Sequence, residues 1–299
     1  MLKKINTIAL LGASNAGKST LINFLTNKYV SIITKKPQTT INIITSKLIK
    51  KNQSLNLIDL PGFSFEKKLF NQVLNDLITN SFKWSDVFFL ISTAEKIVSK
   101  AEIILLKKLS LSQKKIYLII TKIDLGNKNL LDQKIKYFQK YKKIEKIIWV
   151  SVLKNKNLDL LKQTINPFFK KDFELKNTDI SNHNNFLKSK QELFFCKEII
   201  RKSIFESLQK ELPYQIYVEI ESFSNQENLI KIDALLICAK KSQKKIIIGS
   251  KGEKIKQIGI FARKELESYF EKKIYLALFV KVDLNWISNL KTIKKITTL

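Results

Sequence analysis

The chain has 299 residues, of which 44% are hydrophobic and only two are cysteines. This length suffices for two domains with substantial cores, and no apolar run reaches the roughly 18 residues of a membrane span. Cys196 and Cys238 exclude a disulfide scaffold and indicate a reducing compartment, such as the cytoplasm. The only histidine, His183, lies in a polar stretch and is expected to be a solvated linker residue, which gives a histidine-built metal site little support.

The net charge of +28 predicts a polyanionic partner, RNA above all. The positive charge comes from 52 lysines and only two arginines, a bias that the coding composition of a genome can produce by itself. Residues 1–189 carry a net charge of +20 and residues 190–299 carry +8, so the charge does not locate the binding face. The basic start runs directly into the first expected strand, and no cleavable signal is expected there.

The phosphate-binding pattern G-x-x-x-x-G-K-[ST] is matched by Gly12-Ala13-Ser14-Asn15-Ala16-Gly17-Lys18-Ser19. An apolar run with the length of a buried strand precedes it at residues 7–11, and apolar residues at helical spacing follow it. In this arrangement the backbone N–H groups and the positive end of the helix face the phosphates. The flanking strand and helix argue against a chance glycine turn. We therefore expect Lys18 to reach the β and γ phosphates and the Ser19 hydroxyl to bind Mg²⁺.

A polar loop at residues 30–40 follows the first helix and precedes an expected strand at residues 41–50. A loop in this place can close over the γ-phosphate, and a threonine in it can give its hydroxyl to Mg²⁺ and its N–H to the γ-phosphate. Thr40 is the chosen residue and Thr39 the alternative. Taken alone, the segment would as readily be an ordinary polar loop.

The next strand, expected at residues 55–58, runs into Asp59-Leu60-Pro61-Gly62. An aspartate at the end of a buried strand can hold Mg²⁺ directly or through water. The Gly62 N–H can bind the γ-phosphate, so the position of this loop would depend on whether that phosphate is present. The sequence is a common turn by itself, but its place after the phosphate loop predicts a nucleotide switch.

Phe63 follows this turn, where some GTPases place a glutamine that orients the attacking water. Phenylalanine has no donor or acceptor, so the catalytic group must come from elsewhere or turnover must be slow. The side-chain oxygen of Asn15 is the candidate, because it could hold a monovalent cation such as K⁺ that offsets the developing charge. The residues expected to act in catalysis are Asn15, Lys18, Thr40 and Gly62.

Apolar runs at residues 86–92 and 115–120 alternate with helical patterns near residues 70–82 and 99–109. This alternation predicts an α/β domain with a mainly parallel sheet covered on both faces. Ligands bind such sheets at the carboxyl ends of the strands, where the second run ends in Thr121-Lys122-Ile123-Asp124. This sequence matches the guanine-reading pattern [NT]-K-x-D, because an aspartate can accept from the N1–H and the N2 amine together, a donor pair that adenine lacks.

The last strand of this domain is expected at residues 146–150, and a helix at residues 158–168 closes the domain. Between them, small side chains at Ser151 and Val152 would let backbone N–H groups approach the guanine carbonyl. Two tryptophans, Trp84 and Trp149, are expected to pack in the core or against helices. The residues expected to bind GTP are Gly12, Ala13, Ser14, Asn15, Ala16, Gly17, Lys18, Ser19, Thr20, Asp59, Leu60, Pro61, Gly62, Phe63, Thr121, Lys122, Ile123, Asp124, Ser151 and Val152. Those expected to bind Mg²⁺ are Ser19, Thr40 and Asp59.

Residues 171–190 are polar and lack clear periodicity, so we place a linker there between domains at residues 1–170 and 191–299. The second domain has the predicted order helix, strand, strand, helix, loop, helix, strand. The long elements are expected at residues 191–209, 215–222, 229–239, 253–269 and 274–282.

The loop of this domain, Gly249-Ser250-Lys251-Gly252, fits the G-x-x-G of KH RNA-binding domains, which clamps the backbone of about four nucleotides. A helix–helix turn is the usual meaning of a bare G-x-x-G, but the isoleucines before it, the helix after it and the two upstream strands favour KH. The basic segment at residues 240–245 is either a phosphate contact or a solvated helix start. The residues expected to bind RNA are Ile248, Gly249, Ser250, Lys251, Gly252, Lys254 and Ile255, with Ile258 as a further candidate for the apolar groove.

The two halves together resemble the Era GTPases of bacteria over nearly the whole chain. The segments that carry the resemblance are residues 7–25, 37–40, 211–214, 218–221, 242–252, 258–259 and 280–286. The resemblance implies a P-loop GTPase domain followed by a type II KH domain that binds single-stranded sequence near the 3′ end of small-subunit ribosomal RNA. It further implies a monomer that binds GTP and GDP, helps the 30S subunit mature, leaves after hydrolysis, and associates peripherally with the inner membrane.

Three residues depart from the pattern of this family: Ile41 stands in place of arginine, Thr121 in place of asparagine and Val152 in place of alanine. We expect them to change affinity and rate but not the class of reaction. The rival hypothesis is an RNA-binding scaffold with a decayed nucleotide site, against which the retained residues Lys18, Ser19, Asp59 and Asp124 argue. A GTPase that modifies transfer RNA ranks lower, because the sequence shows no catalytic cysteine motif or cofactor-binding segment.

Overall fold

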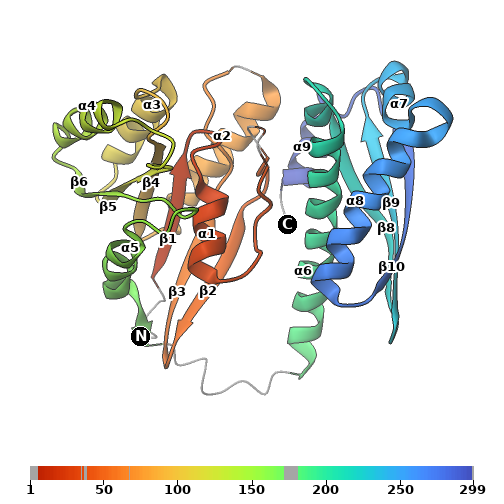
Figure 1. The fold of residues 1–299 in the computed structure, drawn as a ribbon, viewed down its shortest axis with the longest axis horizontal. Helices are drawn as coiled ribbons and strands as arrows, with labels where there is room; N and C mark the ends of the chain where they lie inside the picture. Colours follow the sequence, from red (N-terminus) through yellow and green to blue (C-terminus); the bar gives the residue numbers. More distant parts are fainter. Residues whose placement is uncertain (1–5, 35, 37–38, 67, 172–180, 298–299) are drawn as a thin grey trace. The chain divides into compact units, whose positions relative to one another are not determined.

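The computed structural model describes residues 6–297 except for residues 35, 37–38, 67 and 172–180. It divides into two compact units, Met1–Thr178 and Asp179–Leu299. Figure 1 shows the helices and strands of both units. Among the described residues, none of the helices combines the length and the apolar character needed to cross a bilayer.

The first unit is built on one seven-stranded sheet. Its strands are β1 (Thr7–Gly12), β2 (Ile44–Lys50), β3 (Gln53–Asp59), β4 (Val87–Thr93), β5 (Lys115–Thr121), β6 (Ile144–Trp149) and β7 (Lys170–Lys171). The strand order is β2-β3-β1-β4-β5-β6, with β7 paired to β3. β1, β3, β4, β5 and β6 pair in parallel, whereas β2 and β7 run antiparallel to β3. The predicted mainly parallel α/β sheet is therefore confirmed.

Helices cover both faces of this sheet (Figure 1). They are α1 (Lys18–Thr26), α2 (Leu69–Ser81), α3 (Lys100–Ser110), α4 (Lys128–Gln139) and α5 (Leu158–Ile165), which a short 3₁₀ turn extends at Asn166–Phe168. Successive side chains of β1 enter opposite cores: Ala9 and Leu11 face α2, α3 and α4, while Ile8 and Leu10 face α1 and α5. This two-sided burial explains why the central strands are continuous apolar runs.

The second unit has a three-stranded sheet with helices packed against it. Its elements are α6 (Ser181–Ser207), β8 (Ile216–Asn225), β9 (Leu229–Cys238), α7 (Lys241–Ile248), α8 (Glu253–Phe270), β10 (Lys273–Val282) and α9 (Leu290–Thr297), with 3₁₀ turns at Leu212–Gln215 and Ser250–Gly252. The strand order is β10-β9-β8, with β9 antiparallel to β8 and parallel to β10. The predicted order of elements, and with it the KH fold, is confirmed.

Several expectations differ from the structure. α6 begins at Ser181, inside the predicted linker, because its first turns are too polar to show helical periodicity; His183 therefore lies in a helix. α4 and α9 were not predicted, since each buries only two of its residues. Trp84 and Trp149 are wrong as core residues, because 50% and 37% of their surfaces are exposed.

A buried polar network joins α3, α4 and the end of β4. The Glu102 carboxylate accepts from the Ser99 N–H at 2.6 Å and completes a capping box at the start of α3. Its other oxygen lies 3.5 Å from the ammonium of Lys134 on α4, which also donates to the Ser92 hydroxyl and the Thr93 carbonyl, each at 2.7 Å. The side chains of Lys134 and Glu102 are only 2% and 4% exposed. Burial lowers the pKa of Lys134, and the carboxylate of Glu102 opposes that shift.

We predict that Glu102→Ala destabilises this unit by about 3 kcal/mol, because a buried ammonium loses its counter-charge and the Ser99 N–H loses its acceptor in the capping box of α3. Hydrogen–deuterium exchange of the β4 and β5 peptides would measure the loss. Glu145→Ala is the control, since the ion pair of Glu145 with Lys115, at 3.6 Å, is exposed and contributes little. Equal protection in the two variants would contradict the prediction.

Candidate functional site

The predicted phosphate loop curls between the end of β1 and the start of α1. Gly17, the N-cap of α1, has a φ of 88°, in the left-handed region that favours glycine. A Cβ at Gly12 would collide with the carbonyl oxygen of Ile91 on β4, so glycine is also required there. The loop therefore brings its main chain to the N-terminus of α1, where N–H groups and the helix dipole favour an anion.

Lys18 is the only lysine of this loop, and its ammonium folds back over it. It donates to the carbonyl oxygen of Ala13 at 3.0 Å and lies 3.4 Å from that of Gly12. Burial lowers the pKa of Lys18 to about 8, although the carboxylate of Asp59 acts in the opposite direction. A phosphate at this position would add negative charge beside the ammonium and favour its protonated form.

The three predicted Mg²⁺ ligands lie together. The Ser19 hydroxyl donates to Asp59 Oδ2 at 2.9 Å and is 3.1 Å from the Thr40 hydroxyl. The second carboxylate oxygen, Asp59 Oδ1, is buried and has no hydrogen-bond partner among the residues that the structure describes. Burial raises the pKa of Asp59, against the effects of Lys18 and of hydrogen bonds from Ser31 and Ser19. An all-oxygen set with one unsatisfied carboxylate oxygen fits Mg²⁺.

The alternative switch residue, Thr39, points into its own loop. Its hydroxyl lies 2.8 Å from that of Thr34 and 2.9 Å from the Lys36 carbonyl oxygen. The geometry therefore favours Thr40 over Thr39 as the metal ligand. Pro37 and Gln38, which belong to the same expected switch, lie outside the described residues.

The segment after β3 approaches the phosphate loop through its backbone. A Cβ at Gly62 would clash with the main chain and hydroxyl of Ser14, and the Phe63 N–H donates to the Gly12 carbonyl at 3.0 Å. The side chains of Leu60 and Phe63 are both buried in the hydrophobic core. Leu60 and Phe63 can therefore contact a nucleotide only through their main chains.

The guanine-type loop after β5 is tied to the phosphate loop by Thr121. Its hydroxyl donates to the Ala16 carbonyl at 2.6 Å and lies 3.0 Å from the Ser92 carbonyl oxygen. The two loops are therefore joined although threonine stands in place of the family's asparagine. Asp124 is partly buried three residues further on. Strands β1, β3 and β5 run in parallel, so the three candidate loops meet at one edge of the sheet.

The loop after β6 only partly matches its expected role. The Ser151 N–H donates to the Lys156 carbonyl at 3.2 Å, and the Lys156 N–H returns a bond of 2.9 Å. Ser151 therefore uses its backbone donor within its own turn. Val152, which is half-buried, is left as the proposed backbone donor to a guanine carbonyl.

In the second unit, the glycine loop joins α7 to α8. Gly249 and Gly252 have φ angles of 75° and 81°, and Lys251 between them has 47°. A Cβ at Gly249 would lie 2.7 Å from the Cβ of Lys254, whereas one at Gly252 would meet nothing within 4 Å. Gly249 is thus required by packing, and Gly252 leaves open space at the N-terminus of α8.

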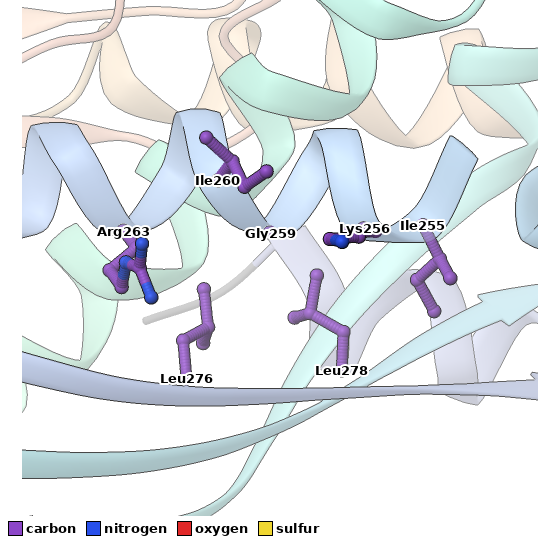
Figure 2. Close-up of a pocket in the computed structure, with 7 residues that line it drawn as sticks. All are labelled: Ile255, Lys256, Gly259, Ile260, Arg263, Leu276 and Leu278. Carbon is purple, nitrogen blue, oxygen red and sulfur yellow. The ribbon is translucent and has the colours of Figure 1, made fainter. Parts of the chain in front are cut away.

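An apolar groove lies between α8 and β10 (Figure 2). It has a volume of about 380 Å³. Its lining consists of Ile255, Lys256, Gly259, Ile260 and Arg263 from α8 and Leu276 and Leu278 from β10. Sequence reasoning found only Ile255 among these, although the four-residue spacing of 255, 259 and 263 and the alternation of 276 and 278 mark one helix face and one strand face. Ile258 is wrong as a groove residue, because its side chain is fully buried.

Comparison with known proteins agrees with this division into two sites. Residues 7–122 match a family model described as a 50S ribosome-binding GTPase, and residues 211–287 match a KH domain. GTPase Era of Ureaplasma urealyticum serovar 10 is 34% identical over 300 residues, which cover 99% of this chain and 98% of the relative. The chain belongs to the Era family of GTPases. GTPase Era of Thermoanaerobacter sp. is 30% identical over 98% of this chain and 96% of its own.

Two solved Era structures share the whole fold. Era of Aquifex aeolicus bound to GDP·AlF₄⁻ is 28% identical with a TM-score of 0.85, and it covers 98% of both chains. An Era complex with MgGDPNP and nucleotides 1506–1542 of 16S ribosomal RNA is 27% identical with a TM-score of 0.86, again over 98% of both chains. This member of the Era family is therefore a GTPase with a KH domain.

We predict that Thr121→Val weakens GDP binding about fivefold to tenfold, because the Ala16 carbonyl loses its hydroxyl donor and the two loops lose their tie. Titration with a fluorescent GDP analogue would measure the affinity. Thr79→Val is the matched control, since that hydroxyl donates to the Asn75 carbonyl within the exposed face of α2. An unchanged affinity in Thr121→Val would mean that the hydroxyl does not support the nucleotide site.

Proposed function

We propose that this GTPase holds the 3′ region of small-subunit ribosomal RNA in its KH groove while GTP is bound, assists maturation of the 30S subunit, and releases the RNA after hydrolysis. The observation that carries the proposal is the groove between α8 and β10, which lies on the helix that begins at the glycine loop. The Era structure with nucleotides 1506–1542 of 16S ribosomal RNA supports the choice of RNA.

The groove suits single-stranded RNA because it combines an apolar floor with cationic side chains. Leu276 and Leu278 on β10 and Ile255 on α8 offer surfaces against which unstacked bases can lie (Figure 2). Lys256 and Arg263 line the same groove and can meet phosphate or base edges. Gly259 leaves room between the walls, since a Cβ there would already lie 3.6 Å from Leu278 Cδ1.

The glycine loop would position the RNA backbone at the end of this groove. Gly252 presents open space at the N-terminus of α8, an 18-residue helix whose positive end favours phosphate. Lys251 and Lys254 add charge on either side of it. Phosphate contacts fix the position of the strand, and the groove contacts the bases.

In the nucleotide half, Ser19, Thr40 and Asp59 would hold Mg²⁺, which when bound neutralises charge on the β and γ phosphate oxygens. Lys18 would turn from the carbonyls of the phosphate loop toward the phosphates. Thr40 and the backbone N–H of Gly62 would sense the γ-phosphate, so its loss would release both switch segments. The proposed coupling is that this release changes how the KH unit holds RNA.

The test of this coupling is RNA affinity in three nucleotide states. Fluorescence anisotropy with a labelled oligonucleotide of the 3′ end of 16S ribosomal RNA should give at least about tenfold tighter binding with a GTP analogue than with GDP, a typical allosteric factor. Gly252→Asp should weaken binding in every state, because it adds negative charge where the RNA phosphate would lie. Gly252→Asn is the matched control, since it has the same size and tolerance for a left-handed backbone without the charge.

Equal RNA affinity with GTP analogue, GDP and no nucleotide would refute the coupling. Equal affinity of Gly252→Asp and Gly252→Asn would instead refute the phosphate contact at the glycine loop. The two results are independent, so either half of the proposal can fail alone.

We infer that Asn15 holds a K⁺ ion beside the phosphates. Support comes from Phe63, whose buried side chain offers no polar group for the reaction, and from the left-handed backbone of Asn15, which lies in the exposed turn of the loop. Single-turnover GTP hydrolysis should then be about tenfold or more faster in potassium than in sodium buffer. This difference should disappear in Asn15→Ala. Equal wild-type rates in the two buffers would contradict the K⁺ site.

We also propose that the protein acts as a monomer in the cytoplasm. We further propose that it binds peripherally to the cytoplasmic face of the inner membrane. Its net charge of +28 supports attraction to anionic lipids. Co-sedimentation should detect binding to vesicles with anionic lipid and not to neutral vesicles, and the bound fraction should fall with salt. No binding to anionic vesicles would refute the membrane contact, and a dimer in analytical ultracentrifugation would refute the monomer.

A further inference from the structure

The loop between β4 and α3 lies against the guanine-type loop and has no assigned role. The N–H of Ala94 donates to the Thr121 carbonyl at 2.9 Å, just beyond the paired ends of β4 and β5. Gly126 packs so closely on Ala94 that a Cβ at Gly126 would lie 2.7 Å from the Ala94 Cβ. The two loops therefore interlock through backbone contacts, and the side chain that follows Ala94 is Glu95.

We propose that Glu95 is a positioning residue for nucleotide binding, which holds the ammonium of Lys122 so that the stem of this lysine can lie along the guanine base. The proposal rests on the assignment of Thr121-Lys122-Ile123-Asp124 as the base-reading loop. It adds a residue from a different loop that touches the lysine and not the nucleotide.

The first argument is the contact itself. The Lys122 ammonium lies 2.7 Å from Glu95 Oε2, and both side chains are about one-third exposed, at 33% and 31%. The hydrogen bond from Lys122 is the main cause that holds the pKa of Glu95 below its usual value, and it outweighs the opposing effect of burial. At neutral pH the carboxylate is therefore charged and can fix the end of the lysine.

The second argument is backbone strain. Lys122 has a φ of 56°, in the left-handed region that residues with a Cβ rarely adopt. Such a conformation persists only where the surroundings determine it. Thr121 is fixed on one side by its hydroxyl bonds to Ala16 and Ser92, and Glu95 fixes the end of the lysine side chain.

The third argument is that Glu95 is itself held in place. The Thr93 hydroxyl donates to the same oxygen, Glu95 Oε2, at 3.0 Å, and also accepts from the Glu95 N–H at 3.3 Å. The Thr93 carbonyl in turn accepts from the buried ammonium of Lys134 at 2.7 Å. A continuous set of contacts thus runs from the packed helix α4 to the lysine of the base-reading loop.

Without the carboxylate, the Lys122 ammonium would lose the acceptor that holds its end in place. Its stem would then sample other rotamers, and the surface that it offers to the base would no longer be preorganised. The Lys122 side chain would then have to be ordered when the nucleotide binds, and the entropic cost of that ordering would weaken the affinity. The effect should be specific to nucleotide retention, because the pair is too exposed to dominate folding.

The test is a double-mutant cycle on nucleotide release. Stopped-flow dissociation of a fluorescent GDP analogue should be roughly three- to tenfold faster in Glu95→Gln than in the wild type. In a Lys122→Met background, Glu95→Gln should have little further effect, because its partner is gone. Glu145→Gln is the matched control, since it removes the carboxylate of another exposed ion pair, with Lys115. In steady state, Glu95→Gln should raise KM more than it changes kcat.

Unchanged release in Glu95→Gln would overturn the inference. The same acceleration with and without Lys122 would also overturn it, because Glu95 would then act by folding its own loop. If Lys122→Met and Asp124→Asn both left release unchanged, the base-reading assignment itself would fail and the inference with it. Failure of the base-reading assignment can therefore be distinguished from failure of the inference about Glu95 alone.

Discussion

Two opposite charges buried at one edge of the sheet form the constraint on which the nucleotide site depends. Lys18 and Asp59 lie beyond β1 and at the end of β3, and burial shifts both of their pKa values toward the neutral forms. Hydrogen bonds partly compensate each buried charge. Lys18 donates to a carbonyl of its own loop, and Asp59 accepts from the hydroxyls of Ser19 and Ser31. A bound triphosphate with its metal ion would supply the missing counter-charges, so ligand binding would complete the site.

Much of this architecture could be predicted, because the chemistry lies on contiguous motifs at strand ends. The phosphate loop, the Asp59 turn and the Thr121–Asp124 loop each follow an apolar run, and parallel strands carry their ends to one edge. The same logic identified the KH unit from its glycine loop and the order of its elements. Thr121, which replaces the family's asparagine, can also be understood from its chemistry, since its hydroxyl can donate to the Ala16 carbonyl.

What the sequence could not reveal depends on side-chain direction and on contacts between distant segments. Trp84 and Trp149 were expected to pack in the core or against helices, yet 50% and 37% of their surfaces are exposed. Ile258 was expected in the groove, but its side chain is fully buried, on the face of α8 that adjoins the groove-lining face of Ile255. The pairing of Glu95 with Lys122 joins residues 27 positions apart, and neither belongs to a pattern that requires the other.

The groove also gives meaning to a rare residue type in this chain. Arg201 and Arg263 are the only arginines beside 52 lysines, and Arg201 is engaged in a buried pair with Glu198 at 2.5 Å. Arg263 is thus the one guanidinium in the groove that we assign to RNA. A guanidinium is flat and weakly hydrated, and it can stack on a nucleobase while it hydrogen-bonds in its plane, whereas an ammonium offers only a point charge. If the groove binds RNA as we propose, Arg263 is the one position in it from which a planar cation could stack on a base.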